Sequence, residues 1–149
     1  MAILAAVGEK HATGKIIETG YDLASTYGDE LQVIHIIPED DAQAHFDELR
    51  TIPDFRGVGI EVEVQRAEEV AARLVDMVLD DYDPEVVTPV GRVGQPAEEI
   101  LAHADAIDAR YLVIGGRKRT PAGKALFGSV TQTVILDSQR PVVTRMAST

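Results

Sequence analysis

Short apolar runs alternate with stretches of helical periodicity along this chain, and that alternation restricts its possible folds more than any other feature. Runs of strand length predict strands at residues 3–7, 31–37, 86–90, 111–114 and 141–145. Apolar residues at helical spacing predict helices near residues 16–27, 42–49, 67–78, 96–107 and 129–136. The segment 38–59 has the least regular pattern.

Strands alternating with helices, with continuously apolar strands, are typical of a parallel sheet that is covered on both faces. Right-handed crossovers leave few topologies, and the doubly wound α/β sandwich is the natural one. We expect one domain over residues 1–149, because no linker separates two apolar cores. Pro89 removes a hydrogen-bond donor from its strand, so this strand is predicted at an edge of the sheet.

Composition excludes several classes of protein. The chain has no cysteine, which excludes disulfide scaffolds, Cys-ligated zinc and thiol catalysis. Its 25 acidic and 14 basic residues give a net charge of −11, so we expect no binding to nucleic acid or to a membrane surface. Without a membrane-length apolar run or a basic leader, a cytoplasmic location is predicted. The acid-rich, lysine-poor composition suits either a halophilic source or an ordinary cytoplasm.

The sequence shows no motif that is typical of a catalytic site. The first strand–helix turn, VGEKHATG, departs from G-x-G-x-x-G and carries an acid where a pyrophosphate would lie, so NAD binding is not expected. The four histidines lack metal-ligand spacing, and His35 is most simply a core residue of a buried strand. We therefore expect no metal site and no catalytic residue.

Glycines mark two predicted strand ends and one predicted helix start. In an open α/β sheet, ligands bind outside the carboxyl ends of strands where the strand order reverses. Glycine lets a ligand approach the backbone, and a helix N-terminus offers free N–H groups to a phosphate. The residues at these points are Val7, Gly8, Gly115, Gly116, Gly128 and Ser129.

Between the last two glycine positions lies a cluster of positive charge in an otherwise acidic chain. Two interpretations are open: the cations are solvated loop residues, or they form an anion site with the adjacent helix start. In the second case we expect phosphate, sulfate, chloride or a nucleotide phosphate at the amides of residues 128–130. The cluster consists of Arg117, Lys118, Arg119 and Lys124.

The C-terminal pattern also identifies a family. GGRK at residues 115–118, nine further residues, GSVT at 128–131 and SQRPVV at 138–143 resemble the signature of universal stress proteins. VGQPAEEI at residues 93–100 is similar to the family's G-x-P-x-x-x-I segment. The resemblance implies a five-stranded parallel sheet in the order 3-2-1-4-5 and a role in stress adaptation.

The resemblance further implies ligands and partners. Many members bind ATP or AMP, with Mg²⁺ accompanying ATP only, and another branch binds no nucleotide. Members are usually homodimers joined through the last strand, here Pro141, Val142 and Val143. The nucleotide site carried over to this chain consists of Val7, Gly8, Ile36, Gly115, Gly116, Arg117, Lys118, Gly128, Ser129 and Val130.

Two departures from the family pattern bear on the ligand. Gly8 replaces the acid that usually ends strand one and faces adenine, which removes a carboxylate acceptor. Lys118 replaces the second glycine of the phosphate motif, where its side chain either fills the cradle or adds a charge contact. Two functions follow: a homodimer that binds an adenine nucleotide without efficient turnover, or a nucleotide-free dimeric module that acts through protein partners. Slow ATP hydrolysis is a third possibility.

Overall fold

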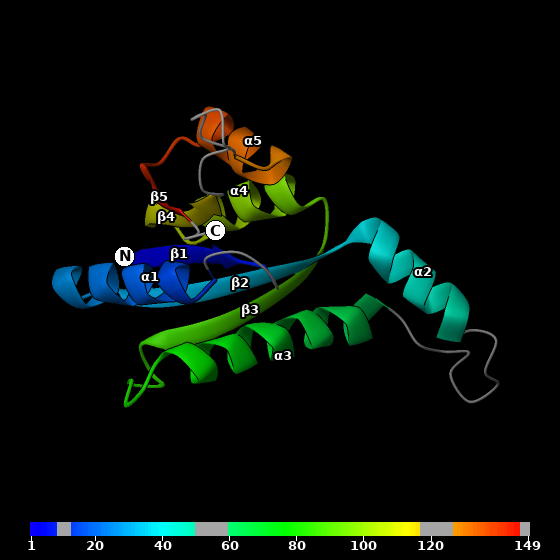
Figure 1. The fold of residues 1–149 in the computed structure, drawn as a ribbon, viewed down its shortest axis with the longest axis horizontal. Coiled ribbons are helices and arrows are strands. Elements are labelled where there is room, and N and C mark those ends of the chain that lie inside the picture. Colours follow the sequence, from blue (N-terminus) through cyan, green and yellow to red (C-terminus); the bar gives the residue numbers. More distant parts are fainter. Residues whose placement is uncertain (9–12, 50–59, 117–126, 147–149) are drawn as a thin grey trace, which may run out of the picture.

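The computed structural model describes residues 1–8, 13–49, 60–116 and 127–146. Five parallel strands form one sheet in the order β3-β2-β1-β4-β5 (Figure 1). The predicted doubly wound α/β fold and its strand order are therefore confirmed, and Pro89 lies in the edge strand β3. The strands are β1 (Ala2–Val7), β2 (Glu30–Pro38), β3 (Val87–Gly94), β4 (Ala109–Gly116) and β5 (Val142–Met146).

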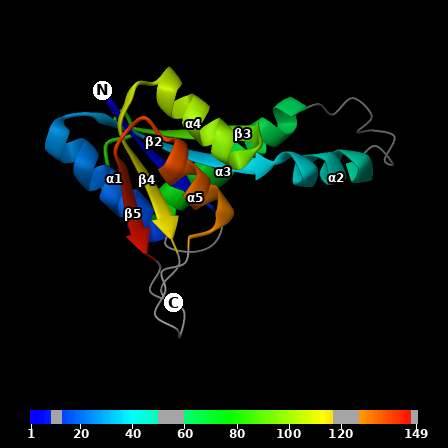
Figure 2. The ribbon, with the colours of Figure 1, turned by 90° about the horizontal axis from the view of Figure 1, so that it is seen from above.

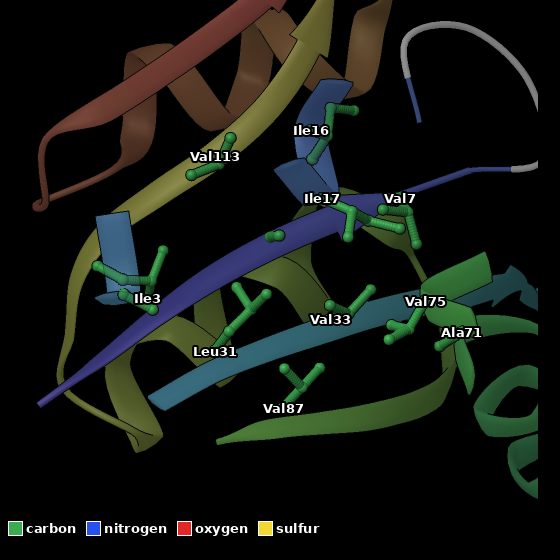
Figure 3. Close-up of a cluster of buried hydrophobic side chains, with 12 residues drawn as sticks. Ile3, Val7, Ile16, Ile17, Leu31, Val33, Ala71, Val75, Val87 and Val113 are labelled. Carbon is green, nitrogen blue, oxygen red and sulfur yellow. The ribbon is translucent and has the colours of Figure 1, made fainter. Parts of the chain in front are cut away.

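Helices cover both faces of the sheet, which explains why β1 is apolar at every position. Ile3 and Val7 face a core formed with α1 and α3 (Figure 3), whereas Leu4 and Ala6 face a second core formed with α4 and α5. Side chains alternate between the faces of a strand, so a sheet buried on both sides needs apolar residues throughout. The helices are α1 (Thr13–Tyr27), α2 (Glu39–Leu49), α3 (Ile60–Val78), α4 (Pro96–Ala106) and α5 (Ser129–Asp137).

Several predicted element boundaries are wrong. β3 continues to Gly94 instead of ending at residue 90, because the long strand β2 still offers it a partner as far as Pro38. β4 begins at Ala109, two residues earlier than predicted, and the glycines at its predicted end, Gly115 and Gly116, pair with β5. In both strands, pairing extends beyond the apolar run that identified the strand.

Helix α3 also begins earlier than predicted, at Ile60 instead of residue 67. The sequence IEVEV at its start alternates as a strand would, yet it forms the first turns of the helix. Helix α2 points away from the sheet (Figures 1 and 2). In the described ranges, no helix is long and apolar enough to cross a membrane.

Gly91 allows α3 to pack very closely on β3. A Cβ atom at this position would lie 2.2 Å from the backbone nitrogen of Glu68 and 2.3 Å from the carbonyl oxygen of Val64. A side chain would therefore push the helix away from the edge strand.

Candidate functional site

A cleft of about 280 Å³ lies at the carboxyl ends of β1, β2 and β4. Because β2 and β4 flank β1 on opposite sides, this is the point where the strand order reverses, and such a crevice is the usual ligand site of an open α/β sheet. The lining residues are Ala6, Val7, Gly8, Ile16, Ile34, Ile36, Pro96, Ile100, Ile114, Gly115, Gly116, Gly128, Val130 and Thr131.

The walls of this cleft are mainly aliphatic. Ile16 comes from α1, Ile36 from β2 and Ile100 from α4, so three elements far apart in the sequence supply apolar surface to one site. Among the lining residues that the structure describes, Thr131 alone carries a side-chain polar atom. Such a cleft suits the flat apolar faces of a ring system, which aliphatic side chains cover well.

The turn between β3 and α4 brings Pro96 to the cleft. Gly94 has φ +154°, a conformation that favours glycine, and its missing Cβ would lie 2.7 Å from Glu99 Oε1. Gln95 is the N-cap of α4 and Pro96 occupies the first turn, as the sequence predicted. The G-x-P segment therefore positions the start of α4 against the strand ends.

The N-terminus of α5 forms the polar end of the cleft. Gly128 is the N-cap residue, with extended φ −64° and ψ 165°, and no side-chain hydrogen bond caps the helix. A Cβ at Gly128 would meet no atom of the described residues within 4 Å, and Gly128 is exposed. Uncapped first-turn N–H groups and the positive end of the helix dipole together attract an anion.

Thr131 joins this helix to the end of β4. Its hydroxyl donates a hydrogen bond of 2.8 Å to the carbonyl oxygen of Gly115, and the residue is buried. The bond positions the first turn of α5 beside the strand end. Sequence reasoning did not include Thr131, although it is the last residue of the GSVT segment.

His35 lies in the core, as the sequence suggested. Its Nδ1 is 3.1 Å from the carbonyl oxygen of Val7, the geometry in which a protonated Nδ1 donates to that oxygen. The bond holds together the ends of two neighbouring strands at the base of the cleft.

The residues predicted for the site fall into three groups. Ser129 forms the first group: it is the first residue of α5, is exposed and lies outside the cleft lining, whereas Gly128 before it is the N-cap residue. Arg117 and Lys118 lie outside the described residues, as do Arg119 and Lys124, so the predicted cation cluster does too. The predicted residues that line the cleft are Val7, Gly8, Ile36, Gly115, Gly116, Gly128 and Val130.

Sequence reasoning about the site missed seven further lining residues, of which Ala6, Ile34 and Ile114 lie in strands. The other four are Ile16, Pro96, Ile100 and Thr131. Each had been interpreted as part of a helix, and their helical patterns indicated burial without indicating against what. The G-x-P segment was the one signal that could have indicated Pro96 and Ile100.

Strongly interacting titratable groups occur at the opposite end of the sheet. Asp29 is buried where β2 begins, and the hydrogen bond from Arg110 Nε, 2.7 Å long, holds the pKa of its carboxyl below the usual value. The described lining of the cleft contains no titratable side chain, and the described residues contain no group of three metal-ligating side chains. The described part of the cleft is thus suited to binding and lacks an acid–base pair.

Comparison with known proteins agrees with this fold. The universal stress protein family model matches residues 1–144, and the chain belongs to that family. A universal stress protein of Mycolicibacterium smegmatis is 46% identical over 59 residues, which are 40% of this chain and 44% of that protein. The stress response protein NhaX of Bacillus subtilis is 40% identical over 50 residues, 34% of this chain and 30% of that protein. The matched segments therefore span less than half of each relative.

Solved structures match nearly the whole chain. A universal stress protein from Archaeoglobus fulgidus has a TM-score of 0.63 and 27% identity, with 97% of both chains covered. A universal stress protein from Archaeoglobus fulgidus in complex with dAMP has a TM-score of 0.58 at 20% identity, covering 97% of this chain and 96% of that one. Another in complex with cAMP has a TM-score of 0.57 at 18% identity, covering 99% and 98%. The last two show likeness of fold alone.

Proposed function

We propose that this universal stress protein binds an adenine nucleotide, ATP or AMP, in the cleft at the β1/β4 crevice. The observation that supports this most directly is the meeting of an aliphatic cleft with the uncapped N-terminus of α5. An aliphatic surface suits a purine ring, and a helix N-terminus suits a phosphate. The complexes of related folds with dAMP and cAMP agree with this class of ligand.

In this proposal the phosphates contact the backbone N–H groups of residues 128–130, with Gly115 and Gly116 allowing close approach from β4. The base lies against Ile36 and is bordered by the backbone of Val7 and Gly8. Arg117 and Lys118 add positive charge to the phosphates, and Mg²⁺ accompanies ATP only. The described lining offers no general base, so turnover is slow or absent.

A pair of substitutions at the N-cap separates phosphate binding from helix stability. Asparagine and aspartate at position 128 both cap a helix well, so Gly128→Asn and Gly128→Asp should leave α5 at least as stable as in the parent. The aspartate also places a negative charge where the phosphate binds. We expect titration calorimetry to show an AMP affinity for Gly128→Asp at least roughly tenfold below that of Gly128→Asn, about 1.4 kcal/mol.

One result would overturn nucleotide binding, and another would overturn the proposed phosphate site. One is the absence of heat when the parent protein is titrated with ATP and AMP at millimolar concentration. The other is equal affinity in Gly128→Asp and Gly128→Asn, which would place the phosphate elsewhere. Far-ultraviolet circular dichroism of both variants confirms that the fold is retained.

A nucleotide-free dimeric module that acts through protein partners is the second candidate. It is favoured by Gly8, which offers no side-chain acceptor to a base, and by a lining in which Thr131 already donates its hydroxyl proton to Gly115. Under this alternative, Lys118→Gly leaves the stress phenotype unchanged. Nucleotide recovered in near-stoichiometric amount from the purified protein would argue against it.

We further propose a homodimer through β5, which includes Val142 and Val143, and the adjoining Pro141. β5 is an edge strand, and Leu112 N donates to the carbonyl oxygen of Pro141. Because hydrogen-bonding direction alternates along a strand, the amide of Thr144 faces the outer edge. Thr144→Pro should therefore convert a dimer to a monomer in light scattering. One domain over residues 1–149 and a cytoplasmic location stay predictions, and a halophilic source and an ordinary cytoplasm both stay open.

A further inference from the structure

Two tyrosines meet at the end of the sheet opposite the cleft. Tyr27 ends α1 and Tyr111 lies near the start of β4, 84 residues apart in the sequence. Their hydroxyl oxygens are 3.1 Å apart, whereas their ring centroids are 5.7 Å apart at an interplanar angle of 49°. The rings therefore converge at their hydroxyl ends, where the ortho carbons of both phenols lie.

The pair is held in place by a partly buried ion pair. The guanidinium carbon of Arg110 lies 4.5 Å from the centroid of the Tyr27 ring, a cation–π contact. Arg110 in turn donates through Nε to Asp29, whose side chain is only 4% exposed. Tyr27 is thus contacted by both Tyr111 and Arg110, and this limits rotation of its ring.

The pair is also accessible, in a chain with few competing sites for one-electron oxidation. Tyr27 is 44% exposed, so a diffusing oxidant reaches it directly. The sequence has no cysteine and no tryptophan, and its other tyrosines are Tyr21 and Tyr82. A radical formed on Tyr27 has a second phenol at hydrogen-bond distance, which allows an electron and a proton to pass between the rings.

We propose that Tyr27 and Tyr111 form a dityrosine cross-link within one chain when the protein meets a peroxide-driven one-electron oxidant. Each phenol loses one electron and one proton, and the two phenoxyl radicals couple through their ortho carbons to form a C–C bond. The two ring hydrogens then move to the oxygens and restore the phenols. The two electrons and two protons reduce one hydrogen peroxide to two waters, so the step is balanced.

Treatment of the full chain with hydrogen peroxide and a haem peroxidase tests this proposal. We expect dityrosine fluorescence in the monomer band of a denaturing gel, and a mass lower by two hydrogen atoms. Tandem mass spectrometry should find peptides containing Tyr27 and Tyr111 joined. Because the bond closes a long loop, the cross-linked monomer should also unfold at a higher temperature than the untreated protein.

Conservative variants provide the controls. Tyr27→Phe and Tyr111→Phe keep the rings and should each reduce the monomer-band fluorescence to background, while Tyr21→Phe and Tyr82→Phe should retain it. Circular dichroism before oxidation verifies that each variant is folded. The proposal is overturned if the monomer-band signal persists in Tyr27→Phe, or if dityrosine appears only in bands of higher mass.

Discussion

Replacing Gly91 by alanine perturbs the close contact between β3 and α3. An added Cβ would lie 2.2 Å from Glu68 N, 2.3 Å from Val64 O and 2.8 Å from the carbonyl carbon of Ala67, and ordinary contact begins at 3.4 Å. All three atoms belong to the helix backbone, so no side-chain rotation relieves the overlap. The distance to Glu68 N must increase by 1.2 Å, the difference between 3.4 and 2.2 Å.

The loss of stability in Gly91→Ala depends on which packing contacts move with helix α3. Ala67, Ala71 and Val75 are buried residues of α3, and a gap of about 0.5–1 Å forfeits roughly a quarter to a half of the dispersion energy of such contacts. Overpacking of this kind costs about 1–3 kcal/mol, and backbone overlap places Gly91→Ala near 3 kcal/mol. With an unfolding entropy near 2.1 cal/mol/K per residue over this chain, the melting temperature should fall by about 10 °C.

Thermal and urea unfolding followed by circular dichroism measure the effect against two matched glycines. A Cβ at Gly116 would meet side-chain atoms of Met146 and Phe127 at 2.8 and 2.9 Å, and these side chains can move, so Gly116→Ala should cost about 1 kcal/mol. Gly128 has open space, and Gly128→Ala should stay within about 1 kcal/mol of the parent. Equal melting temperatures for Gly91→Ala and Gly128→Ala would refute the close packing of α3 on β3.

Two further outcomes are expected. Thr131→Val keeps the side-chain shape but leaves the Gly115 carbonyl without its hydroxyl donor. In urea unfolding the free energy of unfolding should fall by about 1–3 kcal/mol, and AMP binding should weaken because α5 is displaced. Unchanged stability would show that the hydrogen bond is dispensable. The pKa of Asp29 is lowered from 3.8 by its hydrogen bond with Arg110, so its stabilising effect is present above about pH 4 and is lost as the pH falls through the folded-state pKa. When the free energy of unfolding is measured from pH 2 to 6, Asp29→Asn should lose less stability than the parent as the pH falls. An equal loss in both proteins would contradict this assignment.

The element types were predictable because each depends on residues close together in the sequence. Short, predominantly apolar runs identified the strands, and Pro89 identified an edge strand because a missing donor is tolerated only there. The boundaries were less predictable. The last residues of β3 and β4, including Gly94 and Gly116, are in strands because a neighbouring strand supplies their partners, which is not a local property.

The sequence by itself determined the layered α/β fold, the family signature and the glycine positions at the strand ends. These features are local, because hydrophobic periodicity and backbone freedom are properties of short segments. Only the tertiary structure decided which side chains meet at the cleft. Ile16, Pro96 and Thr131 belong to three different helices, and each reaches the cleft because the sheet register and helix packing place its helix there. The same holds for Tyr27 and Tyr111, whose contact depends on how α1 packs against β4.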